Sequence, residues 1–219
     1  TVSGVLTIAV APAAASSTVV ADFEDGTTGI FPSDQGEARS DGAAVGDYYF
    51  RSTSRNFGTS TFQIDSNVTF YWRAYGNNQG IFQLEDKGSG NIRYQLRTDA
   101  GSYTVKDQPA SKTLWTAEQD QWYKLTFDLT DDTLKAVDTS TGDVVYEGGL
   151  ATKSSATPDQ ISMKNALNEG TIEYDYDFIA VDGATATSPV SGVITDQSGE
   201  PVSGATVSAG GTSTTTASD

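Results

Sequence analysis

Apolar and polar side chains alternate with a period of two along much of this sequence, and no window shows the 3.6-residue period of an amphipathic helix. In Asn67–Tyr75, for example, Phe70 and Trp72 would share one face of a strand, opposite Tyr71 and Arg73. Clusters of Gly, Asn, Asp and Ser separate such segments and favour turns. The pattern predicts an all-β chain that folds as an antiparallel sandwich. The predicted strands are 19–23, 47–51, 67–75, 80–86, 91–98, 102–105, 121–129, 134–137, 143–146 and 172–181.

The charge balance excludes several classes of partner. The 219 residues include 29 acidic and 13 basic ones, which gives a net charge of -16. We therefore expect no nucleic-acid partner and no anionic membrane surface, because no basic stripe is available to bind either. The acidic residues are spread along the whole chain, as on proteins from salt-loving organisms, where high salt screens the repulsion.

The chain contains neither His nor Cys. This excludes disulfides, thiolate nucleophiles, zinc-thiolate sites and the Ser-His-Asp mechanism. A metal site in this chain would have to use oxygen ligands, which favours calcium.

The composition changes twice along the chain. Residues 1–16 are apolar and small, and are interpreted as the remnant of a secretory signal; the alternative is a first β-strand, and the run is too short to span a bilayer. Residues 17–184 would form the sandwich and residues 185–190 a linker. Residues 191–219 begin a second β-module. The sequence thus predicts an extracellular or cell-surface location and a longer multidomain protein.

Three segments carry a resemblance to a known family: "VVADFEDG" from Val19, "DQWYKLTFDLTDDTLKAVDTSTGDVVYEG" from Asp120, and "YDYDFIAVDG" from Tyr174. In this order they resemble the opening strand, a central hairpin and the closing strand of concanavalin A-like lectin/glucanase domains, including laminin-G-like ones. The resemblance implies a jelly-roll sandwich over residues 17–184. It also implies that Trp122 is a packing residue, although strict alternation places it on the polar side of its strand.

The C-terminal segment resembles the start of a carboxypeptidase-regulatory-like β-sandwich. That family's motif, G-x-V-x-D-x-x-G-x-P-V-x-G-A-x-V, is matched by Gly192, Asp196, Gly199, Pro201, Gly204, Ala205 and Val207. Pro201 and the glycines fit a tight turn between two strands. Such modules usually serve as spacers or stalks in exported proteins, so the resemblance implies a surface location and says nothing about catalysis.

Three carboxylates, Glu173, Asp175 and Asp177, alternate on the predicted closing strand and would point to one face. A solvated acidic strand face is one interpretation. Hydrolysis of a glycosidic bond is another, since retaining enzymes need two carboxyl groups about 5–5.5 Å apart and neighbours on one face of a strand are roughly 6.6 Å apart. The resembling glucanases carry E-x-D-x-E, and this chain departs from that motif at its last position.

A structural calcium ion is the third interpretation of the same carboxylates. In calcium-binding jelly-roll modules the opening and closing strands bring their acids together. By that resemblance, the predicted metal ligands here are Asp22, Glu24 and Asp177. Calcium takes six to eight oxygen ligands, so carbonyl groups and waters would complete the shell.

A polar face on three successive predicted strands is the candidate ligand-binding site. If the strands are neighbours in one sheet, their polar side chains form one surface. Aromatic rings stack on sugar rings, and Arg with Gln supplies planar hydrogen-bond donors that suit an anionic polysaccharide. Alternatively, the arginines only pair with surface acids. The residues of this predicted face are Tyr71, Arg73, Tyr75, Gln83, Glu85, Arg93, Gln95 and Arg97.

These observations predict an exported, non-catalytic module that binds carbohydrate or recognises a surface, with a polysaccharide or glycoconjugate as its partner. The first alternative is a structural or adhesive surface protein without a sugar site. The second is a polysaccharide lyase or glycosidase; a lyase in a chain without His would need a Tyr as both base and acid. Trp115, in a predicted loop, would be either a ligand platform or a lid over the core.

Overall fold

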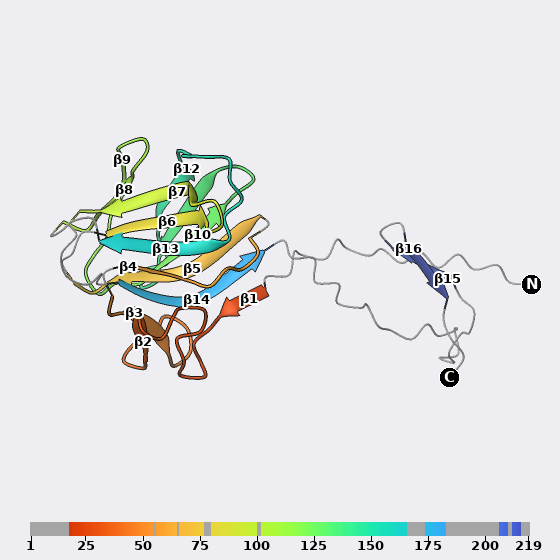
Figure 1. Cartoon of the computed structure of the whole chain (residues 1–219), viewed down its shortest axis with the longest axis horizontal. Coiled ribbons are helices and arrows are strands. Elements are labelled where there is room, and N and C mark those ends of the chain that lie inside the picture. The colour runs from red at the N-terminus through yellow and green to blue at the C-terminus, as the bar shows by residue number, and fades with distance from the viewer. Residues whose placement is uncertain are drawn as a thin grey trace, which may run out of the picture. The chain divides into compact units, whose positions relative to one another are not determined.

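The computed structural model describes residues 18–182, apart from 55, 65, 77–79, 100–101 and 166–173, together with strands 206–209 and 212–215. Contacts divide the chain into two compact units, one of which is Ala15–Ala184. Within the described part of this unit every regular element is a β-strand (Figure 1). Among the described residues we find no helix that could cross a membrane.

Two antiparallel sheets form the sandwich. Sheet A has the strand order β12-β11-β10-β5-β14-β3-β2, with β1 paired to β14. Its strands are β1 (Thr18–Ala21), β2 (Gly36–Arg39), β3 (Tyr49–Ser52), β5 (Asn67–Ala74), β10 (Tyr123–Asp128), β11 (Thr133–Asp138), β12 (Val144–Gly149) and β14 (Tyr174–Asp182). Sheet B has the order β4-β13-β6-β7-β8-β9. Its strands are β4 (Asn56–Gly58), β6 (Gly80–Asp86), β7 (Asn91–Thr98), β8 (Thr104–Asp107), β9 (Lys112–Thr116) and β13 (Gln160–Asn165).

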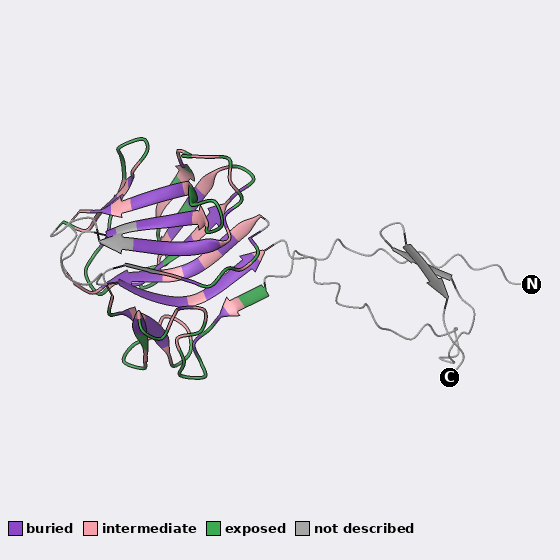
Figure 2. Ribbon diagram, in the orientation of Figure 1, coloured by how far each residue is buried: buried purple, intermediate pink, exposed green. Residues whose placement is uncertain are grey.

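The core lies between the inner faces of the two sheets. Phe70 and Phe127 from sheet A meet Phe82 and Tyr94 from sheet B, with ring centroids 5.2 to 5.9 Å apart. All four side chains are at most 6% exposed, and the strands are mostly buried whereas the turns are exposed (Figure 2). Alternation places these rings inward, so the predicted antiparallel jelly-roll sandwich is confirmed.

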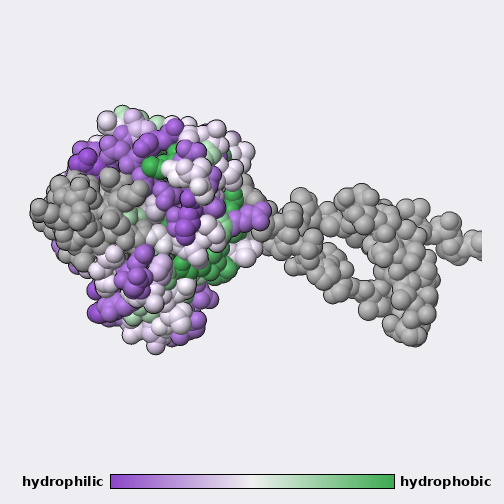
Figure 3. All heavy atoms as spheres, in the orientation of Figure 1, coloured by the Kyte–Doolittle hydropathy of each residue, from purple (hydrophilic) through white to green (hydrophobic). Residues whose placement is uncertain are grey.

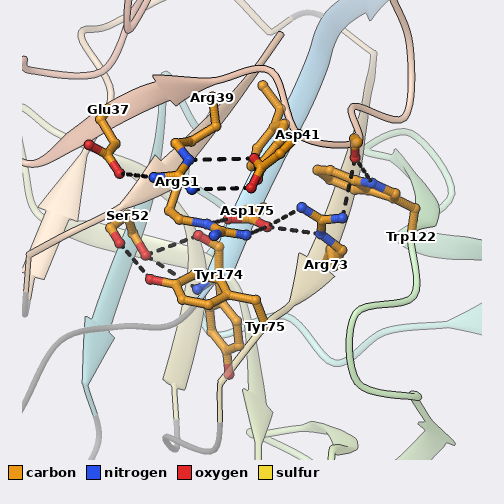
Figure 4. Close-up of polar contacts among 12 residues, drawn as sticks. Glu37, Arg39, Asp41, Arg51, Ser52, Arg73, Tyr75, Trp122, Tyr174 and Asp175 are labelled. Carbon is orange, nitrogen blue, oxygen red and sulfur yellow. Dashed lines mark hydrogen bonds and ion pairs between the residues drawn. The ribbon is translucent and has the colours of Figure 1, made fainter. Parts of the chain in front are cut away.

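A buried ion cluster joins the three neighbouring strands β3, β14 and β5 on the outer side of sheet A (Figure 4). The Asp175 carboxylate is fully buried. It accepts hydrogen bonds of 2.9 Å from Nε and Nη2 of Arg51 and of 2.9 Å from Nε of Arg73. The strand register explains the meeting, because Asp175 lies directly opposite Arg51 on one side and Arg73 on the other. We call these three residues the Arg51–Asp175–Arg73 cluster.

Aromatic rings and a loop shield this cluster from water. The Arg73 guanidinium lies 4.4 Å from the centroid of the Trp122 ring, and the Arg51 guanidinium lies 4.1 Å from that of Tyr75. The carbonyl of Gly42 accepts hydrogen bonds from both Trp122 Nε1 and Arg73 Nη1. A guanidinium that stacks on a ring keeps its in-plane donors free for the carboxylate, so the two kinds of contact are compatible.

Burial and the two guanidinium groups act in opposite directions on the Asp175 carboxylate, and the effect of burial is the larger. Burial raises the pKa of Asp175, and the hydrogen bonds and charges of Arg51 and Arg73 oppose that rise. The pKa of Arg51 is itself raised, chiefly by its hydrogen bonds to Asp175. Removing one partner of such a buried set leaves a charge without compensation, which costs far more than losing an exposed ion pair.

The other unit contributes one described element, a hairpin of β15 (Thr206–Ala209) and β16 (Thr212–Thr215). The two strands are antiparallel, with Thr206 opposite Thr215 and Ala209 opposite Thr212. The carboxypeptidase-regulatory-like motif predicted from Gly192 to Val207 lies outside the described residues except for its last two positions, as does the predicted signal remnant at 1–16. Both stay predictions.

We expect Asp175→Ala to lower the free energy of unfolding by about 3 to 5 kcal/mol, because it leaves two guanidinium groups in the cluster without an acid. Urea unfolding followed by tryptophan fluorescence measures this loss. The control is Glu147→Ala, which removes an exposed ion pair with Lys135 and should cost less than about 1 kcal/mol. Equal losses for the two variants would contradict the role given to the cluster.

Candidate ligand-binding face

The residues of the predicted ligand face lie on two different sheets. The strand β5, which carries Tyr71 and Arg73, belongs to sheet A, whereas β6 and β7 belong to sheet B. Their polar sides therefore point to opposite outer faces of the sandwich. The expectation of one continuous surface is wrong, because consecutive strands in this fold need not be neighbours in one sheet.

On sheet A, two of the predicted ligand residues are committed to the protein itself. Arg73 is 8% exposed and belongs to the ion cluster described above. Tyr75 donates its hydroxyl hydrogen bond of 2.7 Å to the carbonyl of Ser52 and stacks under Arg51. Tyr71 is half-buried and meets Phe178 edge to face, with ring centroids 6.4 Å apart. Phe178 has a φ of 41° at a bulge in β14, so its backbone is strained there.

Arg93 is turned away from the outer face of sheet B by a β-bulge. The register of β6 and β7 shifts between Leu84 and Glu85, so that Glu85 pairs with Ile92 and skips Arg93. The Arg93 guanidinium reaches the turn between β10 and β11, where it bonds the carbonyl of Leu129 and, at 2.8 Å, the carboxylate of Asp132. Period-two alternation placed Arg93 with Gln95 and Arg97, and the bulge makes that placement wrong.

A row of small polar side chains crosses the centre of the outer face of sheet B. Ser162 on β13 pairs with Gln83 on β6, which pairs with Gln95 on β7. Ser162 Oγ donates to Gln83 Oε1 at 3.3 Å, and Lys153 Nζ donates to Gln95 Oε1 at 2.7 Å. The amide nitrogens of both glutamines have no hydrogen-bond acceptor among the described residues. We call Ser162, Gln83 and Gln95 the amide row.

The amide row is unusually buried for an outer face. Gln83, Gln95 and Ser162 are 3%, 8% and 4% exposed, although they point away from the core that Phe82 and Leu84 line. Polar side chains with so little exposure need hydrogen-bond partners. The hydrogen bonds of Ser162 and Lys153 hold the side chains of the row in a fixed geometry, with little of their surface open to solvent. Hydrophilic residues cover much of the visible surface of the sandwich (Figure 3).

A depression with two cations lies next to the amide row. Arg97 on β7 pairs directly with Lys106 on β8, and both extend over the outer face. The depression has a volume of about 210 Å³ and is lined by Arg97, Asp99, Lys106, Gln108 and Ser111. Its ionised groups add to a charge of +1 in a chain of net charge -16. Lys106 and Asp99 were missed in the sequence, although alternation with the buried Val105 places Lys106 outward.

Two members of the predicted carboxylate row are buried. Asp175 and Asp177 are both 0% exposed, so the interpretation of a solvated acidic strand face is wrong for them. Both carboxylates point outward from sheet A, but the loop around Gly42 to Val45 lies over them. Glu173 lies outside the described residues. Neither buried carboxylate is placed to reach a glycosidic bond in solvent.

The predicted calcium ligands make separate contacts. Glu24 accepts hydrogen bonds from the backbone amides of Asp47 and Tyr48, and Asp22 Oδ1 accepts one of 3.4 Å from the amide of Glu24. Among the described residues no three His, Cys, Asp or Glu side chains are grouped closely enough to hold a metal ion. The buried Oδ1 of Asp177 has no hydrogen-bond partner, and this observation favours a cation at that atom. Calcium binding stays a prediction of the sequence.

Asp177 is a group with a raised pKa. Its Oδ2 accepts hydrogen bonds of 2.8 Å from the amides of Ala44 and Val45 and so holds the loop before β3. Burial raises the pKa of Asp177 to about 6, and the charge of Glu24 adds to the rise, whereas the amide hydrogen bonds oppose it. The folded protein thus binds this proton more tightly than the unfolded chain does, and stability falls as pH rises from about 4 to about 6.

The two tryptophans singled out in the sequence are both packing residues. Trp122 lies on the outer side of sheet A, as alternation predicts, and packs there on Arg73 rather than in the core. Trp115 is 6% exposed and lies on β9, with its ring 6.2 Å from that of Tyr123 and 6.4 Å from that of Tyr146. It also lines a small apolar cavity of about 20 Å³. The predicted loop placement of Trp115 is therefore wrong, because the residue lies on a strand and belongs to the core, where it is too buried to be a ligand platform.

No family model matches the chain, and no curated protein matches it. Among solved structures, it is similar to Cellulose induced protein, with 15% identity and a TM-score of 0.46 over 72% of this chain and 94% of that one. It is also similar to the carbohydrate-binding module CBM66 from Bacillus subtilis, with 16% identity and a TM-score of 0.35 over 75% and 90%. A third is the Bacillus licheniformis β-glucanase, with 11% identity and a TM-score of 0.42 over 76% and 92%. Identities of 11 to 16% with TM-scores below 0.5 carry no information about what this chain binds.

We expect Asp177→Asn to stabilise the protein relative to the wild type as the pH rises. Asn keeps an oxygen acceptor for the two loop amides but cannot ionise, so the difference in free energy of unfolding should grow by about 2 kcal/mol between pH 4 and pH 7. Urea unfolding at several pH values, with a chelator present, measures the difference.

The control is Asp86→Asn. The hydrogen bond from Ser89 lowers the pKa of Asp86, so this variant should lose stability relative to the wild type as the pH rises. A difference between Asp177→Asn and the wild type that is constant with pH would contradict the raised pKa of Asp177.

Proposed function

We propose that this sandwich is a non-catalytic carbohydrate-binding domain whose ligand lies on the outer face of sheet B. The observation that carries the proposal is the amide row, in which donors on neighbouring strands are held in place by Ser162 and Lys153. Sugars present closely spaced hydroxyl groups, and a fixed row of amide groups can pair with several of them at once. Preorganised donors bind with a smaller entropy cost than mobile ones.

The charge of the adjoining surface supports an acidic polysaccharide as the ligand. Arg97 and Lys106 are neighbours beside the row, in a chain whose net charge would otherwise repel a polyanion. A guanidinium group pairs with carboxylate or sulfate with good geometry. The extracellular location predicted from the sequence stays part of this proposal, as does attachment to a longer chain.

Retardation in native gels that contain neutral or acidic polysaccharides tests the proposal, at high and low salt. We expect the wild-type protein to be retarded by an acidic polysaccharide. Gln95→Ala and Arg97→Ala should each weaken retention about tenfold, the effect of losing one good hydrogen bond or ion pair in a bound complex. Each variant should keep the melting temperature of the wild type within a few degrees.

The control is Tyr71→Ala, which changes the outer face of sheet A and should leave retention unchanged. Loss of retention in this variant alone would move the binding site to sheet A. Absence of retention by every polysaccharide would contradict the proposal and favour the structural or adhesive role.

Calcium is tested separately. If Asp177 ligates calcium, millimolar calcium raises the melting temperature of the wild type and not that of Asp177→Asn, because binding to the folded state alone stabilises it. An identical melting temperature with calcium and with a chelator would contradict calcium binding. Magnesium serves as the control for ionic strength.

A further inference from the structure

One carboxylate already occupies the depression beside the amide row. Asp99 follows the end of β7, and its carboxylate lies between the two cations of the paired strands. Its Oδ1 is 3.6 Å from Arg97 Nε, and its Oδ2 forms an ion pair with Lys106 Nζ. An oxygen of an acidic ligand would compete for these same two cations.

The contact between Asp99 and Arg97 is incomplete. A separation of 3.6 Å is too long for a hydrogen bond, and the buried Arg97 Nε has no hydrogen-bond partner among the described residues. Since Nε itself is covered, an anion from solvent would meet the exposed part of the Arg97 side chain, where a carboxylate or sulfate can pair with the guanidinium group. Arg97 would therefore pair better with a carboxylate or sulfate at hydrogen-bond distance than it does with Asp99.

All three charged side chains are also open to solvent. The side chains of Arg97 and Lys106 are each 36% exposed, and that of Asp99 is 28% exposed. Ion pairs with this exposure contribute little to stability, so breaking the two contacts between the Asp99 carboxylate and these cations costs little in itself. This distinguishes the depression from the Arg51–Asp175–Arg73 cluster, whose acid is fully buried.

We propose that the depression is a subsite for a single carboxylate or sulfate group, and that Asp99 is an internal competitor for it. The inference rests on the proposed function and extends it to one position of the ligand. Asp99 holds the cations when no ligand is present and repels a free small anion. A polysaccharide that is also bound by the amide row displaces Asp99, because its acidic group then arrives at a high effective concentration. Asp99 thus makes the subsite selective for anions attached to a glycan.

Inorganic sulfate is the first probe, because it tests the subsite without any glycan. Sulfate titrations followed by the NMR signal of Arg97 Nε–H would give the affinity. We expect Asp99→Asn to bind sulfate about tenfold more tightly than the wild type, since the competing charge is removed. Asp99→Ala serves as a second variant and should show the same direction.

The matched control is Asp34→Asn, an exposed acid in the turn before β2 of sheet A, which changes the net charge equally. It should alter sulfate affinity less than twofold. A change for Asp99→Asn no larger than that for Asp34→Asn would overturn the role of Asp99. Sulfate shifts that avoid Arg97 and Lys106 altogether would overturn the subsite.

A second experiment shows whether the subsite or the proposed function is at fault if a result disagrees. Gel retardation is measured with polygalacturonate and with its methyl ester, which has the same backbone without the charges. Asp99→Asn should strengthen retention by polygalacturonate and leave retention by the ester unchanged. Tighter sulfate binding without retention by either polysaccharide would contradict the proposed function alone, whereas retention that is insensitive to Asp99→Asn would contradict the inference alone.

Discussion

The carboxylate of Asp175, held by two guanidinium groups, is the interaction on which the architecture of sheet A depends. It links β14 to β3 on one side and to β5 on the other, and β14 is the strand that also receives β1. Hydrogen bonds, and the stacking of Arg73 on Trp122 and of Arg51 on Tyr75, offset part of the cost of burying these charges. The loop before β3 is bound to the same place through Gly42.

The two outer faces of the sandwich differ in how their polar groups are used. Where the outer side of sheet A carries the ion cluster, its polar groups are shielded and paired within the protein, and they are unsuited to a ligand. The outer side of sheet B has the opposite character. Its central polar residues, Gln83 and Gln95, are buried and held by hydrogen bonds to their amide oxygens, and the cations beside them are partly exposed. The outer face of sheet A thus uses Arg51 and Arg73 for structure, and the outer face of sheet B is the one proposed for recognition.

Much of the sandwich could be predicted from the sequence because burial imposes a period of two on strands such as β5 and β10. Long-range pairing could not be read from the same pattern. Alternation predicts that Tyr71 and Gln95 are both polar and outward, but not that their strands lie in different sheets. It also fails at bulges, as with Arg93, and it cannot reveal that a loop covers Asp175 and Asp177.

Mapping of backbone-amide chemical shifts during addition of polygalacturonate tests the central claim most directly, since it reports which outer face meets the ligand. We expect perturbations on β6, β7, β8 and β13, centred on Gln83, Gln95 and Arg97, with β5 and β14 unchanged. Perturbations centred on Tyr71 and Phe178, or none at any polysaccharide concentration, would contradict it.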